Sequence, residues 1–136
     1  MKRVVVLFFT LLLSNNAFAQ EHVVISNKTM KALSPSQIKA IFLKKMSIIG
    51  DVQVVPVSLQ VQDPLRKSFE KHILKMSFTR LKSYWTAQHY LGVRPPLSMR
   101  SQESVKSFVK KVDGSIAYID IENLDSDLKV LYSWED

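Results

Sequence analysis

The sequence predicts an α/β fold in which a mixed β-sheet is flanked by helices. Two apolar patterns alternate along the chain. Short runs rich in β-branched residues are typical of strands, and apolar residues spaced three and four apart are typical of helices. In chain order the predicted elements run β-α-β-α-α-α-β-β, which favours a sheet covered by helices. The chain has 136 residues, 46% of them hydrophobic and 23% charged, which fits one globular domain.

The first 19 residues have the organisation of a secretory signal. Two basic residues precede the apolar run Val4–Leu13, and Ala17-Phe18-Ala19 forms a small-x-small cleavage pattern. The run is short for a bilayer span, and an uncleaved membrane anchor is the alternative. We therefore expect residues 1–19 to be a Sec-type signal peptide and residues 20–136 to be a single periplasmic domain, with no membrane insertion after cleavage.

The first predicted strand is followed along the chain by the first predicted helix. His22–Ser26 is a β-branched apolar run and predicts a strand. Ser34-Pro35 predicts a helix start, because serine accepts a hydrogen bond from the first turn and proline suits the first helical position. The buried stripe of this helix is expected to consist of Ile38, Ile41 and Phe42.

A second strand and second helix follow. Gly50-Asp51 predicts a turn before a single strand over Val52–Leu59, in which Pro56 indicates an edge position or a bulge. Asp63-Pro64 predicts another capped helix start. Its buried stripe is expected to consist of Leu65, Phe69 and Ile73.

Two more helices are predicted before the last strands. Ser77 is expected to cap a third helix with Phe78, Leu81 and Trp85 on its buried stripe, and Trp85 to pack against the sheet as Phe42 does. Gly92 and Pro95-Pro96 predict an extended loop. Ser101 is expected to cap a fourth helix. Its inward residues are expected to be Val105, Phe108, Val109 and Val112.

The C-terminal part predicts two strands. Asp113-Gly114 marks a turn before a strand over Ser115–Ile121. The last strand is expected over roughly Leu128–Trp134, with the apolar residues Leu128, Val130 and Tyr132 in regular alternation.

Charge is distributed unevenly along the chain. Residues 20–112 hold 16 Lys and Arg against five Asp and Glu, whereas residues 113–136 hold one Lys and seven acidic residues. The basic part could meet nucleic acid, an anionic membrane face or a small anion such as phosphate. The alternative is a solvated surface across which the acidic part folds. Export and the lack of a nucleic-acid-binding motif argue against a nucleic-acid partner.

Several kinds of chemistry are excluded by composition. The chain has no Cys, which excludes disulfides, Cys-based metal sites and thiol catalysis, and it has only three Gly, which excludes Gly-rich phosphate loops. The three histidines, His22, His72 and His89, have no metal-ligand spacing. No serine-nucleophile elbow, His-Glu-x-x-His motif or buried carboxylate pair is present. We predict a protein that is not an enzyme and needs no cofactor.

Four segments of the chain resemble the phosphate-binding proteins of ABC transporters, a group of type II periplasmic binding proteins. Their order and spacing carry the resemblance, which covers nearly all of residues 20–136. The segments are Leu33–Leu43 (LSPSQIKAIFL), Val54–Val57 followed by a helix with Arg66 and Phe69, Ser83-Tyr84-Trp85, and Val112–Ile119 (VDGSIAYI).

The resemblance implies one lobe of a two-lobed architecture. Complete members close two lobes around the anion, and this chain has room for one lobe only. The resemblance implies a small oxyanion such as phosphate as ligand, and an ABC transporter or a sensor protein as partner. The Ser-Gly-Thr trio that holds phosphate in complete members is missing here. Its place has Pro64, which lacks an N–H, and Asp63, whose carboxylate fills the helix cap.

Five residues are candidates for ligand binding. Arg66 lies one turn inside a helix and could donate to an oxyanion, or it could be a surface residue beside Asp63 or Glu70. Ser34 and Ser36 could offer hydroxyl and N–H groups at their helix start, although capping alone explains Ser34. The remaining candidates flank the loop between the second strand and the second helix. They are Ser58 and Gln62.

Two functions are consistent with these patterns. The first is a periplasmic, non-catalytic solute-binding-like protein that binds phosphate or another small oxyanion. The alternative is a single-lobe interaction or regulatory module that has lost its ligand site and contacts an envelope sensor or transporter. A monomeric lobe leaves the anion half solvated, so the expected phosphate Kd is no tighter than ~0.1–1 mM. A homodimer could supply the missing wall.

Overall fold

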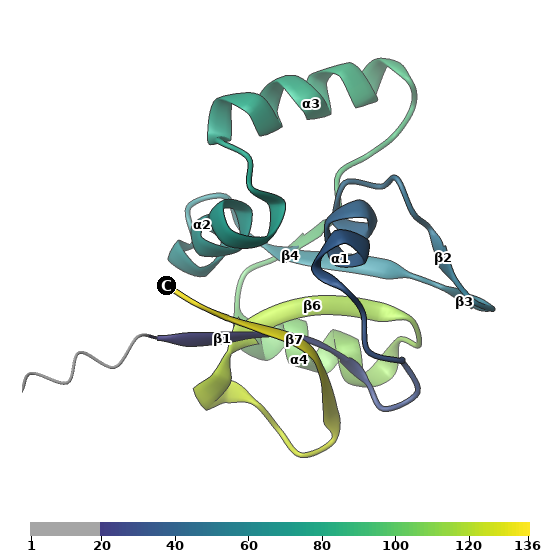
Figure 1. Cartoon of the computed structure of the whole chain (residues 1–136), viewed down its shortest axis with the longest axis vertical. Helices are drawn as coiled ribbons and strands as arrows, with labels where there is room; N and C mark the ends of the chain where they lie inside the picture. The colour runs from purple at the N-terminus through teal and green to yellow at the C-terminus, as the bar shows by residue number, and fades with distance from the viewer. Residues whose placement is uncertain (1–19) are drawn as a thin grey trace, which may run out of the picture.

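The computed structural model describes residues 20–136, and the expected signal peptide lies outside this range (Figure 1). The strands are β1 (Glu21–Asn27), β2 (Ile48–Ile49), β3 (Val52–Gln53), β4 (Val55–Leu59), β5 (Leu97–Met99), β6 (Ser115–Asp120) and β7 (Leu128–Glu135). The helices are α1 (Pro35–Phe42), α2 (Pro64–Phe69), α3 (Phe78–Tyr90) and α4 (Gln102–Lys111). A π-helical turn η1 (Glu70–Leu74) continues α2, and a 3-10 turn η2 (Ile121–Asn123) follows β6.

Five strands form one mixed sheet in the order β5-β4-β6-β1-β7, and β2 and β3 form a separate hairpin. Strand β4 runs parallel to β5 and β6, whereas β1 is antiparallel to both β6 and β7. The predicted mixed sheet flanked by helices is therefore confirmed. Because β4, β5, β6 and β7 share one direction, their carboxyl ends meet at the same edge of the sheet.

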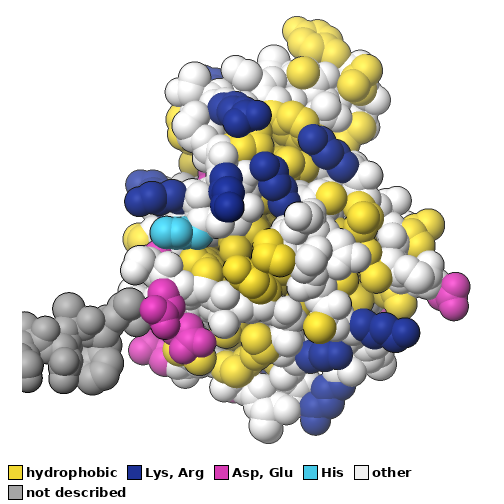
Figure 2. Space-filling model, in the orientation of Figure 1, with side chains coloured by type: hydrophobic (Ala, Val, Ile, Leu, Met, Phe, Trp, Pro, Cys, Tyr) yellow, Lys and Arg dark blue, Asp and Glu magenta, His cyan; other side chains and the backbone are white. Residues whose placement is uncertain are grey.

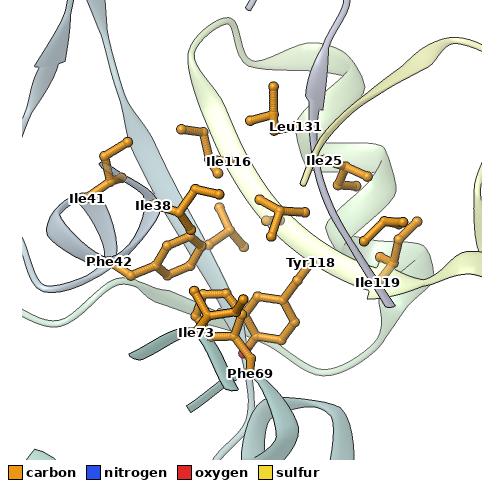
Figure 3. Close-up of a cluster of buried hydrophobic side chains, with 14 of the residues drawn as sticks. Ile25, Ile38, Ile41, Phe42, Phe69, Ile73, Ile116, Tyr118, Ile119 and Leu131 are labelled. Carbon is orange, nitrogen blue, oxygen red and sulfur yellow. The ribbon is translucent and has the colours of Figure 1, made fainter. Parts of the chain in front are cut away.

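The two faces of the sheet are covered by different helices. Along β6, Ile116 and Tyr118 point toward α1 and α2, whereas the hydroxyl of Ser115 donates to a carbonyl of α4. Figure 3 shows Tyr118 beside Phe69, and their rings stack with centroids 4.2 Å apart. The Phe42 ring meets Phe69 edge-on at 4.7 Å. This aromatic cluster confirms that Phe42 is buried, as its place on the α1 stripe predicts.

The helix starts follow the predicted capping chemistry. Ser34 and Gln37 form a reciprocal capping box at α1. The Asp63 carboxylate accepts from the Leu65 N–H at 2.9 Å and caps α2. The serines predicted as caps of α3 and α4 also accept from the first turn of those helices. They are Ser77 and Ser101.

Helix α3 differs from its prediction. Phe78 was expected on the buried stripe but is 64% exposed, and Trp85 was expected in the core but is half-buried. The reason is the position of α3, which stands away from the sheet in Figure 1 and buries only Leu81. By contrast, the α4 stripe is buried at Val105 and Val109, with the other two predicted residues half-buried.

Three strand predictions are corrected. The single strand expected over Val52–Leu59 is two elements, β3 and β4. Pro56 lies neither in an edge strand nor at a bulge, because β4 is between β5 and β6 and pairs with both in regular register. Its missing N–H is tolerated because β5 begins to pair only at Val57. In β7, Leu131 is an extra residue relative to β1. The side chains change face there, so Val130 is exposed and Leu131 is buried.

Gly114 fixes the turn between α4 and β6. Its φ of +79° is in the left-handed region, and a Cβ at this position would lie 2.1 Å from the carbonyl oxygen of Gln53. Only glycine allows β3 to approach this turn so closely. Within residues 20–136, no helix combines the length and hydrophobicity needed to cross a membrane.

Candidate anion-binding cleft

A cleft of about 330 Å³ lies at the carboxyl end of β4, between α2–η1, α3 and the loop before β5. Its wall is mostly apolar, with a few polar side chains that converge on it, which is the usual make-up of a ligand site. We call it the Arg66 cleft. It is lined by Phe42, Ser58, Val61, Arg66, Phe69, Glu70, Leu74, Phe78, Leu81, Lys82, Trp85, Pro95, Pro96 and Ser98.

Arg66 is held in place on one side of the cleft. Its Nε donates to Oε1 of Glu70 at 2.9 Å, and its Nη1 donates to the carbonyl oxygen of Leu59 at 2.8 Å. The pairing with Glu70 that sequence analysis considered is therefore present. A guanidinium carries five N–H donors, so three are not used by these two bonds. Arg66 can bind an anion without giving up its own partners.

The floor of the cleft contains the Ser58 hydroxyl, which is bonded to the buried hydroxyl of Tyr118 behind it. The Oγ of Ser58 lies 2.6 Å from the hydroxyl oxygen of Tyr118, which also accepts from the N–H of Leu59 at 3.1 Å. Burial raises the pKa of Tyr118 to about 12, although the hydrogen bonds from Ser58 and Leu59 act in the opposite direction. The phenol is therefore neutral at physiological pH. It fixes the Ser58 hydroxyl at the base of the cleft.

The opposite rim comes from α3 and the loop before β5. Lys82 is exposed on α3, Trp85 is half-buried beside it, and Ser98 lies on β5. Sequence reasoning named none of these three as ligand residues. Trp85 had a signal as an aromatic on a helix and was assigned to the core, whereas Lys82 and Ser98 had none. They come together only because α3 and β5 return to the end of β4.

The other predicted residues lie elsewhere. Gln62 lines a neighbouring groove, where its amide donates to the side chain of Gln60 at 3.0 Å. Ser34 and Ser36 are exposed at the start of α1, and neither lines the Arg66 cleft. Of the five candidates, the structure therefore brings Ser58 and Arg66 together, places Gln62 nearby and separates the two serines of α1.

A second hollow, of about 280 Å³, lies near the carboxyl ends of β6 and β7. We call it the His22 pocket. Both ring nitrogens of His22 lie against carboxylates, Nδ1 at 2.6 Å from Asp120 and Nε2 at 2.8 Å from Asp136. The pocket is lined by Gln20, His22, Asp63, Pro64, Leu65, Gln102, Asp120 and Asp136.

The polar groups of the His22 pocket are bonded to one another. Asp136 also accepts from Ser68, and the hydrogen bonds from Ser68 and His22 lower the pKa of Asp136. The Gln102 amide donates to Asp120 at 2.9 Å. Together with the Asp63 cap, three carboxylates line this pocket. An incoming anion would meet like charge here, and the helix start of α2 is already satisfied.

Within residues 20–136, no group of three or more His, Asp or Glu side chains is arranged to hold a metal ion. The carboxylates of the His22 pocket are engaged by hydrogen-bond donors.

Comparison with known proteins gives a match at the level of structure. No family model matches the sequence, and no curated protein matches it. An ABC-type phosphate transport receptor from Vibrio cholerae superimposes with a TM-score of 0.65 at 15% identity, over 83% of this chain and 46% of that one. A putative phosphate ABC transporter substrate-binding protein with bound phosphate from Clostridium perfringens gives 0.67 at 21% identity, over 83% and 45%.

A third structure, PstS from Borrelia burgdorferi, gives a TM-score of 0.60 at 11% identity, over 83% of this chain and 47% of that one. The chain has the fold of one lobe of a phosphate-binding protein. This confirms the resemblance stated from the sequence, and the chain spans about half the length of the structures it matches. Those structures are named as transport receptors and substrate-binding proteins, not as enzymes.

Proposed function

We propose that this protein is a non-catalytic, solute-binding-like lobe that holds a small oxyanion such as phosphate in the Arg66 cleft. The observation that carries the proposal is the set of donors at the end of β4. Arg66 has unused N–H groups, the Lys82 ammonium is on the opposite rim, and the Ser58 hydroxyl lies at the floor. Such donors are suited to an oxyanion, because charge-assisted hydrogen bonds are stronger than neutral ones.

The binding is expected to be weak. The cleft belongs to a single lobe and Lys82 on its rim is exposed, so solvent screens the charges. The Glu70 carboxylate also lines it and repels an anion. A phosphate Kd of about 0.1–1 mM is consistent with two or three partly solvated ionic contacts.

The cellular setting is part of the proposal. Residues 1–19 act as a cleaved signal peptide, and residues 20–136 function in the periplasm as one domain. The structural matches to proteins named for phosphate transport support an ABC transporter as the partner. The alternative protein partner is a sensor protein of the cell envelope.

A second candidate function is an interaction module without a small ligand. The His22 pocket favours it, because the protein's own side chains satisfy the polar groups at the strand ends. A homodimer is a variant of the first function in which a second copy supplies the missing wall of the Arg66 cleft.

Calorimetric titration of the purified protein with phosphate and with sulfate tests the first function. The variant Lys82→Gln removes one rim charge from an exposed position, and Lys111→Gln is the matched control on α4. We expect Lys82→Gln to weaken phosphate binding about two- to fivefold, as loss of one exposed ionic contact does. Lys111→Gln should leave the Kd unchanged.

Absence of binding heat in the calorimetric titration up to about 10 mM phosphate, a concentration well above the expected Kd, would reject the anion-binding function in favour of the interaction module. Binding that tightens with protein concentration, with a dimer in sedimentation velocity, would support the homodimer instead.

A further inference from the structure

A long groove adjoins the Arg66 cleft on the same face of the molecule. The two hollows share Val61, Glu70 and Phe78, and the groove has a volume of about 800 Å³. We call it the Lys71 groove. It follows α2 and η1 to the start of α3, and its other distinctive lining residues are Lys67, Lys71 and Lys75.

The groove is strongly basic. Within residues 20–136, Lys67, Lys71 and Lys75 form no ion pair. The one carboxylate that lines the groove, Glu70, is paired with Nε of Arg66 at 2.9 Å. From residue 71 to residue 102 the sequence has no Asp or Glu. Figure 2 shows Lys and Arg side chains gathered around apolar surface between α2 and α3. The charge of this surface is therefore uncompensated.

The same groove exposes apolar side chains to water. Phe78, at the first position of α3, is 64% exposed, and Val61 is 48% exposed. Met76, which also lines the groove, is half-buried. Exposed apolar surface that is rimmed by polar or charged side chains is typical of an interaction site.

We propose that the Lys71 groove binds an extended segment of a partner protein in which carboxylate and apolar side chains alternate. Lys67 on α2 and Lys71 on η1 are four residues apart, about one helical turn, so the two lysines lie on the same side of this segment. In an extended peptide, side chains on the same face repeat every ~7 Å, so carboxylates on alternate residues match the lysines. The intervening apolar side chains point to the other side of the strand, and the proposal assigns Val61 and Phe78, which line the same hollow, as their contacts.

The shape of the surface favours a peptide over a lipid bilayer. The apolar side chains line a hollow that also contains Glu70. A peptide can enter such a hollow, whereas a flat bilayer surface would rest on its rim. This proposal goes beyond the small-anion function and does not depend on it.

The test uses the purified protein and a synthetic peptide in which Glu alternates with Leu. Calorimetric titration measures its Kd at low and high salt. Two comparison peptides separate the contributions, one with Gln in place of Glu and one with Ser in place of Leu. We expect both to bind at least about tenfold more weakly, because charge and apolar contact are both required.

Two variants and two matched controls locate the binding. Phe78→Ser and Lys71→Glu change exposed positions in the groove. Ile48→Ser makes a similar change at a 61% exposed position on β2, and Lys111→Glu makes a similar change on α4. We expect about a tenfold loss of peptide affinity for the first pair and less than about twofold for the second. Circular dichroism verifies that all four variants are folded.

The proposal is overturned if the Glu-Leu peptide does not bind, if the Gln peptide binds equally well, or if the control variants weaken binding as much as the groove variants. Binding to phosphatidylglycerol vesicles without binding to the peptide would also overturn it. Peptide binding by a protein that shows no phosphate binding would leave this proposal standing and reject the anion function alone.

Discussion

The Arg66 cleft and the His22 pocket lie near the carboxyl ends of strands of one sheet, yet their electrostatics are opposite. In the His22 pocket, carboxylates from Asp120 and Asp136 enclose a buried histidine. In the Arg66 cleft, Arg66 and Lys82 both line the wall, and Arg66 has donors not used by protein partners. The difference indicates that position at a strand end does not define a binding site. Our proposal uses spare hydrogen-bonding capacity as the criterion, and on that criterion it assigns the anion to the cleft and a structural role to the pocket.

The largest expected effect concerns the pocket. His22 is 2% exposed and connects two carboxylates, so His22→Ala leaves both without this partner. We expect it to lower the free energy of unfolding by about 2–4 kcal/mol, with Asp136 contributing less than Asp120 because it is more exposed. Urea unfolding measures the loss. His89→Ala, at an exposed position on α3, is the control and should cost less than about 0.5 kcal/mol. A similar cost for both variants would mean that the pocket is not structural.

The next effect concerns the floor of the cleft. Tyr118→Phe removes the acceptor of the Leu59 N–H and the partner of the Ser58 hydroxyl. We expect a loss of about 1–3 kcal/mol, the usual cost of leaving buried polar groups unpaired. In the unmodified protein, absorbance titration should show one tyrosine that ionises at about pH 12. Loss of that transition in Tyr118→Phe would confirm its assignment. A variant as stable as the unmodified protein, or one that loses a transition near the ordinary tyrosine value of 10.0 instead, would contradict this account of the floor.

A smaller effect is expected at acid pH. Hydrogen bonds from Ser68 and His22 lower the pKa of Asp136, and one from Lys110 lowers the pKa of Asp125. Their stabilisation is fully present above the ordinary value of 3.8, and it is lost as the pH falls through the lower folded pKa values. We expect the free energy of unfolding to decrease below that pH. Asp136→Asn should reduce this decrease, whereas the neighbouring Glu135→Gln should not. Equal curves for both variants would exclude Asp136 as a source of the acid dependence.

The smallest effect on stability is expected at the rim of the cleft. Lys82 is exposed, so Lys82→Gln should change the free energy of unfolding by less than about 0.5 kcal/mol while weakening phosphate binding. Lys82→Gln is therefore expected to weaken binding without lowering stability, whereas His22→Ala is expected to lower stability. A large loss of stability would mean that Lys82 has a structural partner and would weaken its assignment to the anion.

The fold could be predicted because its main signals are local. Ser34, Asp63 and Ser101 cap the helices they were expected to cap, and the apolar stripes of α1 and α2 face the sheet. Local patterns could not show that β5 pairs with β4, or that Leu131 is an extra residue opposite β1. Both depend on contacts between segments that are distant in sequence.

The candidate site was predictable only in part for the same reason. Arg66 and Ser58 could be named because they flank one loop. Lys82, Trp85 and Ser98 reach the cleft from α3 and β5, whose positions no local pattern specifies. The exposure of Phe78 was missed because helical spacing predicts an apolar stripe but not whether another element covers it.

Phosphate titration followed by amide resonances of the isotopically labelled protein tests the central claim most directly, because it locates the anion. We predict saturable shifts at Ser58, Arg66 and Lys82, with a Kd of about 0.1–1 mM. Asp63→Ser should leave that Kd unchanged, because Asp63 lines the His22 pocket and not the Arg66 cleft. Shifts centred on Leu65 and Gln102, or a marked gain in affinity in Asp63→Ser, would place the anion in the His22 pocket and contradict the account.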